Sequence, residues 1–174
     1  LTQRTRRANG RQLVVLDTLD AETFTTLLSA LDYARTAFLF ISKSGGTVET
    51  CAQALCLIEA ARQAGVTDLP ARAAAITCAG DSALSALALQ HGIPQIAHDP
   101  HLGGRFSILS VAGLLPAAFM GLDIAALRRG AAEGLRESLH APAEESPAAL
   151  GAAWHVAQME AGRTVSAFMP YSEQ

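Results

Sequence analysis

The chain has 174 residues, of which half are apolar and 17% are charged, and its formal net charge is −3. This length suits one domain with one well-filled core. The acidic balance argues against a surface that binds nucleic acid or an acidic membrane. No apolar stretch reaches the roughly 18 residues that a bilayer-spanning helix needs, and no signal peptide is visible. We therefore expect a cytoplasmic protein without nucleic-acid or membrane partners.

No metal site and no cofactor are expected. Cys51, Cys56 and Cys78 lack the spacing of metal ligands, and their odd number favours reduced thiols. His98 and His101, on either side of a proline, are weak evidence for a metal site. The GxGxxG pattern of nicotinamide-binding domains is absent, and so is an acidic residue placed for a ribose.

In the first part of the sequence, short apolar runs alternate with amphipathic stretches. Strands are predicted at residues 12–16, 37–41, 72–77 and 93–97. Helices are predicted at residues 21–31, at residues 47–64, and from a cap at residue 81 or 82 to residue 91. The expected caps are Asp20 and either Asp81 or Ser82 at the helix starts, with Gly65 and Gly92 beyond the helix ends. The arginines at positions 4, 6, 7 and 11 are expected in a solvated terminal helix or loop. Because strands alternate with helices at this spacing, the sequence predicts an α/β fold with a mostly parallel sheet.

Beyond residue 105 the pattern becomes helical. Residues 107–118 are nearly all apolar and are expected to form a buried helix. Asp123 is the expected cap of a helix whose apolar face holds Ile124, Leu127, Ala131 and Leu135. Ser146 and Pro147 form an N-cap and N1 pair for a helix to about residue 162. Residues 164–169 are predicted as a final strand.

The most informative segment lies between the strand at residues 37–41 and the helix after it. Residues 42–47, called here the 42–47 loop, read Ser-Lys-Ser-Gly-Gly-Thr. The glycines let the backbone turn sharply, the hydroxyls donate hydrogen bonds, and the helix start adds unpaired N–H groups. The loop lacks the spacer and terminal Gly-Lys-Ser/Thr of a Walker loop. From spacing alone, phosphate binding and a plain turn with an N-cap both remain open. The apolar face of the following helix is predicted to hold Val48, Cys51, Ala52, Leu55 and Ile58.

A second Gly-Gly pair lies in the polar loop after the strand at residues 93–97. Ligands of open parallel sheets bind beyond the carboxyl ends of the strands, and both loops are such ends. Arg105 follows Gly103 and Gly104 and offers a guanidinium, which is always charged and can bind a phosphate or a developing oxyanion. The alternative is an ion pair between Arg105 and a carboxylate such as Asp99.

Together, the two loops resemble the signatures of the glucose-6-phosphate isomerase family. Residues 40–50 are similar to its Ser-Lys-Ser/Thr-x-x-Thr-x-Glu-Thr motif, and residues 103–107, with residues 114–116 after them, are similar to its Gly-Gly-Arg-Tyr/Phe-Ser motif. The resemblance runs from about Leu13 to Ser172. It implies a sugar-isomerase (SIS) domain, which is a three-layer α/β/α fold with a flavodoxin-like, mostly parallel sheet. Residues 1–174 are expected to form a single SIS domain. Because the chain begins with Leu1 and not Met, it is expected to be a fragment or a processed piece of something longer. The resemblance implies that the parent is an isomerase and a homodimer.

The resemblance also implies roles for individual residues. Ser42, Ser44 and Thr47, with the main-chain amide of Lys43, would hold the phosphate of glucose 6-phosphate or fructose 6-phosphate. Arg105 would stabilise the negative charge of the cis-enediol intermediate through which these sugars interconvert in glycolysis and gluconeogenesis. Four further positions are expected beside the site: Gly45, Gly46, Glu49 and Gly104. Glu49 has an alternative interpretation that is at least as good: its carboxylate lies in the first turn of the helix because the helix dipole stabilises a negative charge there.

Several features of the family are not matched in this chain. The Gly-Ile-Gly-Gly-Ser turn that precedes the Ser-Lys-Ser loop and contacts the sugar phosphate is absent, so a gap or an exposed edge is expected in the sheet. The catalytic glutamate of a Glu-Ser-x-Gly-Lys motif, the ring-opening histidine and the C-terminal lysine have no match. The chain alone is therefore expected to bind sugar phosphate without isomerising it. Two alternatives stay open: an isomerase fused to a transaldolase, and a non-catalytic SIS module that senses a phosphosugar.

Overall fold

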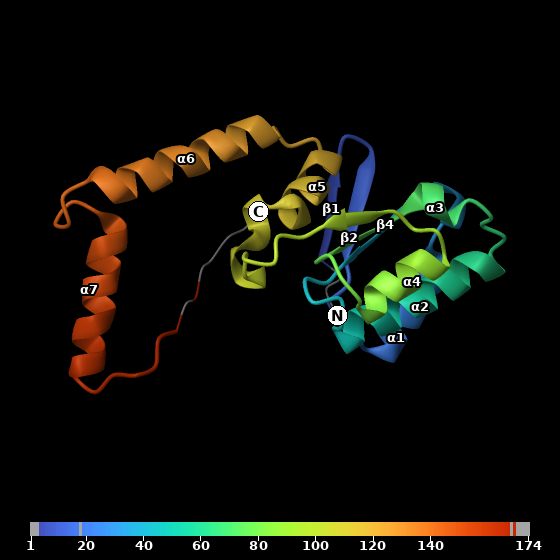
Figure 1. The fold of residues 1–174 in the computed structure, drawn as a ribbon, viewed down its shortest axis with the longest axis horizontal. Coiled ribbons are helices and arrows are strands. Elements are labelled where there is room, and N and C mark those ends of the chain that lie inside the picture. The colour runs from blue at the N-terminus through green and yellow to red at the C-terminus, as the bar shows by residue number, and fades with distance from the viewer. Residues whose placement is uncertain (1–3, 18, 168, 170–174) are drawn as a thin grey trace. The chain divides into compact units, whose positions relative to one another are not determined.

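The structure is a computed structural model that describes residues 4–17, 19–167 and 169. The chain divides into two compact units, one ending at Ile124 and the other beginning at Ala125. Figure 1 shows the course of the chain through both units, and each unit is described by itself.

The first unit begins with a β-hairpin. Strands β1 (Arg4–Ala8) and β2 (Arg11–Val15) pair antiparallel in a sheet of their own. Asn9 and Gly10 join them with φ values of 51° and 73°. Two successive positive φ values are those of a type I′ turn, for which Asn-Gly is the preferred pair. The expectation of a solvated helix or loop for the arginine-rich start is therefore wrong, and the strand predicted at residues 12–16 is confirmed one residue earlier.

A three-stranded parallel sheet forms the centre of the first unit. Strands β3 (Phe38–Ile41), β4 (Ala73–Thr77) and β5 (Gln95–Ala97) lie in the order β3-β4-β5. The register pairs Ile41 with Ile76 and Thr77 with Ala97. No gap separates these strands, and β3 and β5 are the edges of the sheet within the described residues. The predicted α/β class with helices around a parallel sheet is confirmed.

Four α-helices and a short 3₁₀ helix accompany this sheet. They are α1 (Ala21–Ala30), the 3₁₀ helix η1 (Tyr33–Arg35), α2 (Val48–Gln63), α3 (Leu69–Arg72) and α4 (Ala83–Gln90). The predicted caps are confirmed at α1 and α4, where Asp20 accepts from the Thr23 N–H at 2.7 Å and Ser82 accepts from the Ser85 N–H at 3.2 Å. The Thr23 bonds lower the pKa of Asp20. These caps satisfy N–H groups that a helix start leaves unpaired.

The core of the first unit lies between α2, α4 and the sheet. Its buried residues are Phe38, Phe40, Ala54, Leu57, Ile58, Ala61, Ala73, Ala75, Leu84, Ala88 and Ile93. On α2, the buried positions follow the helical spacing i, i+3, i+4, i+7 from residue 54. The predicted apolar face of α2 is confirmed at Ile58 and in part at Cys51, which packs against the core half-buried. It is wrong at Val48 and Leu55, which are 74% and 54% exposed. The face that is buried carries two alanines, whose small size lets the helix approach the strands closely.

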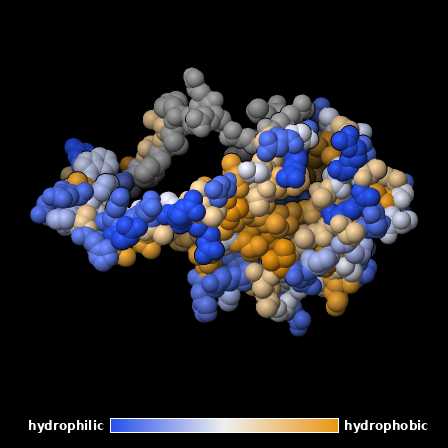
Figure 2. All heavy atoms as spheres, turned by 90° about the horizontal axis from the view of Figure 1, so that it is seen from above, coloured by the Kyte–Doolittle hydropathy of each residue, from blue (hydrophilic) through white to orange (hydrophobic). Residues whose placement is uncertain are grey.

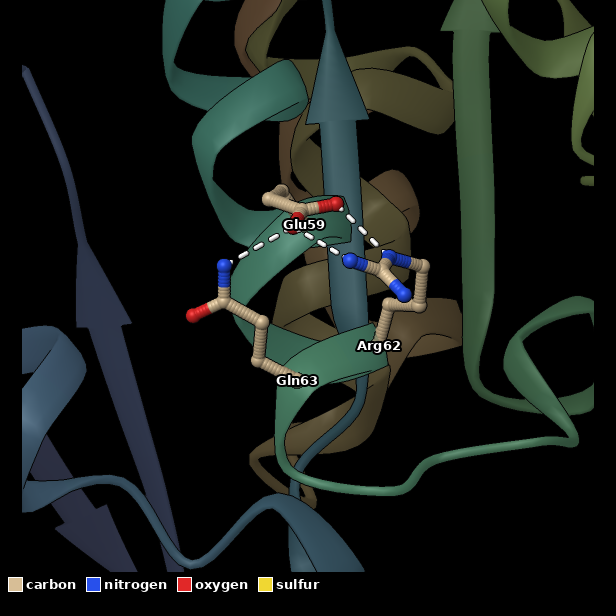
Figure 3. Close-up of polar contacts among 3 residues, drawn as sticks. All are labelled: Glu59, Arg62 and Gln63. Atoms are coloured by element: carbon tan, nitrogen blue, oxygen red, sulfur yellow. Dashed lines mark hydrogen bonds and ion pairs between the residues drawn. The ribbon is translucent and has the colours of Figure 1, made fainter.

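The carboxyl end of α2 carries a polar cluster on the surface. Glu59 accepts hydrogen bonds from Arg62 Nη2 at 2.7 Å, Arg62 Nε at 2.8 Å and Gln63 Nε2 at 2.8 Å (Figure 3). An arginine in the last turn also suits the negative end of the helix dipole.

The segment after β5 differs from its prediction. A 3₁₀ helix, η2 (Gly104–Leu109), precedes α5 (Val111–Phe119), which starts late because Ser110 caps it by accepting from the Ala112 N–H at 3.2 Å. Residues 107–118 were expected to be buried, but no residue of η2 or α5 is, and Ile108 is 76% exposed. Figure 2 shows apolar side chains gathered on the molecular surface. An apolar run predicts a helix correctly here but does not fix what covers it.

The second unit holds α7 (Pro147–Glu160) and, apart from its first residue, α6 (Ile124–His140). Ser146 caps α7, as predicted, by accepting from the Ala149 N–H at 3.4 Å. The predicted apolar face of α6 is only partly covered, with Leu127 41% and Leu135 61% exposed.

The final strand expected at residues 164–169 is absent from the described part of that range. Residues 164–167 and 169 have no regular structure, because no described segment pairs with them. Residue 168 and residues 170–172, which end the family resemblance, lie outside the described residues. Among the helices that the structure describes, none has the length and apolar character to cross a membrane.

Candidate functional site

The 42–47 loop sits at the carboxyl edge of the parallel sheet, between β3 and α2. The Ser42 N–H donates to the Ile76 carbonyl at 3.0 Å, which extends the β3–β4 pairing by one residue, and the Gly45 N–H donates to the Ser42 carbonyl at 3.1 Å. Ser42 is 5% exposed, and its Oγ lies 2.8 Å from Thr47 Oγ1. The hydroxyls at the two ends of the loop therefore meet.

The loop approaches the neighbouring strand so closely that only glycine fits at position 45. The φ of Gly45 is +64°, and a Cβ there would lie 2.0 Å from Ser82 Oγ and 2.8 Å from Thr77 Oγ1. At Gly46, by contrast, the nearest atom to an added Cβ is Ser44 Oγ at 4.0 Å. The first glycine is thus needed both for its backbone conformation and for the space that it leaves.

The loop carbonyls are bound to the structure around them. The Lys43 carbonyl accepts from the Cys78 N–H at 2.9 Å, and the Gly45 carbonyl accepts from the Leu84 N–H at 2.8 Å. The Gly45 carbonyl also accepts from Cys51 Sγ at 3.6 Å. These two carbonyls are therefore held by Cys78, just after β4, and by groups of α2 and α4.

Half of the main-chain donors of the loop are unoccupied. Among the described residues, the main-chain N–H groups of Lys43, Ser44 and Thr47 have no acceptor. Thr47 is the N-cap residue of α2, yet its side chain makes no capping bond, so the first turn of the helix keeps its unpaired N–H groups. The side-chain capping bond that a plain turn with an N-cap would offer is therefore not made by Thr47. Unpaired N–H groups at a helix start, with hydroxyls beside them, are the chemistry of an anion site.

The other predicted loop residues lie at the surface or close to it. Lys43 is half-buried, whereas Ser44 and Glu49 are exposed. Ser44 Oγ accepts from the Gly46 N–H at 3.3 Å. Glu49 lies in the first turn of α2, where a carboxylate is favoured by the helix dipole.

The polar loop after β5 is tied down by its own backbone. His98 is 3% exposed; its N–H donates to the Thr77 carbonyl at 2.8 Å, and its Nδ1 lies 2.8 Å from the Asp99 carbonyl. Asp99 Oδ1 accepts from the His101 N–H at 2.8 Å. No three His, Cys, Asp or Glu side chains of the described residues gather in a way that could hold a metal ion.

Arg105 lies in η2 and is exposed. It makes no hydrogen bond or ion pair with any described residue, so the alternative pairing with Asp99 does not occur. Gly104 beside it is exposed too, and an added Cβ there would meet nothing within 4 Å. No bond joins Arg105 to the 42–47 loop. The loops start from strands on either side of β4, about 10 Å apart from strand to strand.

The whole sequence, residues 1–174, matches the family profile described as phosphoglucose isomerase. The chain belongs to the phosphoglucose isomerase family. It is 35% identical to the glucose-6-phosphate isomerase of Carboxydothermus hydrogenoformans over 94% of its length and 35% of that protein's. It is 42% identical to a probable glucose-6-phosphate isomerase of Haloarcula marismortui, over 92% of its length and 36% of that protein's. A solved structure of a hypothetical protein from Thermus thermophilus is similar with a TM-score of 0.76 and 34% identity, covering 83% of this chain and 35% of that one. The chain thus spans about a third of the length of the curated relatives that it matches.

In this member of the phosphoglucose isomerase family, sequence reasoning missed the residues that surround the 42–47 loop. Thr77 and Ser82 lie against Gly45 from the end of β4 and the start of α4. Thr77 could have been found from its position in the sequence. It is the polar residue that ends an apolar strand, and the carboxyl end of that strand lies at the same sheet edge as the loop.

A surface hollow of ≈ 280 Å³ lies nearby on α4 and β5, lined by Asp81, Ser82, Ser85, Ala86, Leu89 and Gln95. It includes none of the predicted site residues. Ser85 Oγ donates to Gln95 Oε1 at 2.6 Å, so two of its polar groups already satisfy each other.

Proposed function

We propose that the 42–47 loop binds the phosphate of glucose 6-phosphate or fructose 6-phosphate, and that Arg105 stabilises the cis-enediol intermediate of their interconversion. Membership of the phosphoglucose isomerase family supports this, as do the names of its relatives. The observation that carries the proposal is the set of unpaired N–H groups at Lys43, Ser44 and Thr47. We further propose a cytoplasmic, homodimeric enzyme of glycolysis and gluconeogenesis as the setting, in keeping with the family resemblance and the free cysteines.

A phosphate group suits the loop because it is an anion with several acceptor oxygens. Main-chain N–H groups and the hydroxyls of Ser42, Ser44 and Thr47 donate to it, and hydrogen bonds to a charged acceptor are stronger than neutral ones. The positive end of the α2 dipole adds to the attraction. A sugar without a phosphate leaves these donors unsatisfied, so the loop selects phosphorylated sugars.

Arg105 has the chemistry that the reaction needs at its reacting end. Moving a proton between C1 and C2 passes through an enediolate, whose negative charge is larger than that of either sugar. A guanidinium that binds this charge more strongly than the ground state lowers the barrier. The residue that removes the proton is proposed to be absent from residues 1–174, since no segment matches the Glu-Ser-x-Gly-Lys motif.

Calorimetric titration of the 174-residue chain tests the phosphate role. Fructose 6-phosphate is expected to bind, and unphosphorylated fructose is the matched ligand that is not. Replacing Ser44 and Thr47 together by alanine should weaken fructose 6-phosphate binding about tenfold or more, because two charge-assisted bonds are lost. Ser138→Ala is the control, since its hydroxyl bonds the Gly134 carbonyl in the second unit. Unchanged affinity in the double variant would restore the plain-turn interpretation.

A separate pair of measurements tests Arg105 and the missing base. A hydroxamate analogue of the enediolate should lose more affinity than fructose 6-phosphate on Arg105→Ala, because only the analogue carries the charge that Arg105 is proposed to meet. Equal losses for both ligands would contradict that role.

In a coupled assay the chain alone should not convert fructose 6-phosphate to glucose 6-phosphate. Turnover by residues 1–174 would show that the base is present after all.

A further inference from the structure

Thr77, the last residue of β4, carries a hydroxyl to which the proposed reaction gives no role. The residue is 2% exposed, and its Oγ1 donates to the Lys43 carbonyl at 3.4 Å. A buried hydroxyl without a hydrogen-bond partner is costly. The Lys43 carbonyl, across the sheet edge in the 42–47 loop, is the acceptor available to this hydroxyl among the described residues.

This carbonyl belongs to the same peptide group as one of the proposed phosphate donors. In a planar trans peptide the C=O and the following N–H point in opposite directions. Fixing the Lys43 carbonyl therefore fixes the direction of the Ser44 N–H, which has no acceptor among the described residues. The Cys78 N–H at 2.9 Å supplies the first bond to this carbonyl, and the Thr77 hydroxyl supplies the second.

The backbone of the loop also lies directly against the Thr77 hydroxyl. A Cβ at Gly45 would be 2.8 Å from Thr77 Oγ1. The Gly45 carbonyl is also bound by a group outside the loop, because it accepts from the Leu84 N–H at 2.8 Å. Both carbonyls are thus held from the side of β4 and α4, and Thr77 is a side chain that bonds one of them and also lies close to Gly45.

We propose that Thr77 is a positioning residue, whose hydroxyl fixes the Lys43–Ser44 peptide and keeps the Ser44 N–H available to the phosphate of a sugar phosphate. The inference rests on the proposed function of the 42–47 loop. Valine at position 77 has nearly the same shape but no donor, so the carbonyl keeps only the Cys78 bond and the peptide is less constrained. Serine keeps the donor and loses one methyl group.

The test measures the affinity of the full 174-residue chain for inorganic phosphate and for fructose 6-phosphate by calorimetry, alongside urea unfolding. Thr77→Val is expected to weaken both ligands about tenfold, the equivalent of one hydrogen bond. Thr77→Ser is expected to stay within about twofold of the unsubstituted chain. Thr36→Val is the matched control: its hydroxyl also bonds a carbonyl, that of Asp32 at 2.7 Å, but it precedes β3 at the end away from the loop.

Each outcome decides the inference. Unchanged affinity in Thr77→Val, while the Ser44 and Thr47 double variant binds more weakly, overturns the role of Thr77 and leaves the phosphate site intact. If the double variant is unchanged as well, the proposed function itself fails. A tenfold loss in Thr77→Ser also overturns the inference, because the hydroxyl is still present, and this variant decides the case if Thr77→Val does not fold. An equal loss in Thr36→Val would overturn it too, by showing a general effect of removing a hydroxyl.

Discussion

The 42–47 loop and the segment that carries Arg105 leave the same edge of the sheet, but they are built differently. The loop is joined to β4 and α4 by main-chain hydrogen bonds, next to Ile76 and Leu84, which are 0% and 1% exposed. In η2 and α5, all of whose residues the structure describes, none is buried. The proposed phosphate site is therefore fixed by the core, whereas Arg105 lies on a segment that the core of this chain scarcely holds. Mutations in the two regions should have different effects.

The largest expected difference comes from the same substitution in each region. Ile76→Ala removes a fully buried side chain from β4 and should lower the free energy of unfolding by about 2–5 kcal/mol. Ile108→Ala removes a side chain that is 76% exposed and should change it by less than about 0.5 kcal/mol. Urea unfolding followed by circular dichroism measures both. A comparable loss in Ile108→Ala would mean that η2 is held by contacts as extensive as those of β4.

The next largest effect is expected at Gly45. Gly45→Ala forces a Cβ to within 2.0 Å of Ser82 Oγ at a φ of +64°, which should cost about 2–3 kcal/mol of stability. Gly46→Ala is the control for stability, because its Cβ would meet nothing closer than 4.0 Å. The same urea experiment compares the two variants. Equal destabilisation would show that the loop does not lie against β4 and α4 as closely as described.

A smaller effect is expected where α5, which follows the segment that carries Arg105, is joined to strand β2 of the hairpin. Arg11 Nη1 donates to the Phe119 carbonyl at 2.7 Å, and its guanidinium carbon lies 5.5 Å from the centre of the Phe119 ring. Arg11→Ala should cost about 1 kcal/mol of stability. Arg35→Ala is the matched control, since Arg35 is exposed on η1 without a side-chain bond to another described residue. Indistinguishable unfolding midpoints would mean that β2 does not help to hold α5.

The sequence predicted most of what depends on neighbouring residues. Three predicted strands are confirmed to within two residues at each end: those at residues 37–41, 72–77 and 93–97. The caps at Asp20, Ser82 and Ser146 are confirmed as well. Both kinds of prediction succeed because hydrophobic period and helix capping are local properties of the sequence. The hairpin strand β1 was missed although Asn9-Gly10 is a local turn signal. What depends on distant packing could not be predicted.

Two errors show this dependence on packing. The predicted apolar face of α2 includes Val48 and Leu55, which are exposed, because the sheet packs against the neighbouring face that carries Ala54 and Ala61. The segment at residues 107–118 was expected to be buried because it is apolar, yet burial requires a covering surface. In the candidate site, the motif predicted the 42–47 loop, but the support from Thr77 joins residues 34 positions apart and no local pattern contains it.

The smallest effect is expected at the end of α2 that lies away from the loop, where Glu59 contacts Arg62 and Gln63 (Figure 3). These hydrogen bonds, that of Arg62 foremost, lower the pKa of Glu59 from 4.5 to about 2 and raise the pKa of Arg62. Because the pKa is lower in the folded state, the cluster stabilises the fold above pH 4.5, and this contribution is lost as the pH falls toward 2. The Glu59 side chain is 50% exposed, so water and salt screen the ion pair.

Glu59→Gln should therefore shift the urea midpoint only slightly at neutral pH. The shift should shrink as the pH falls from about 4.5 toward about 2, where the glutamate becomes protonated. It should also shrink in about 1 M salt, which screens the attraction between Glu59 and Arg62. Affinity for fructose 6-phosphate should not change, because α2 is held by its buried residues Ala54, Leu57, Ile58 and Ala61 and not by its surface charges. A loss of phosphate affinity in Glu59→Gln as large as that in Thr77→Val would contradict this. It would mean that surface charges along α2, and not the core contacts, set the geometry of the 42–47 loop.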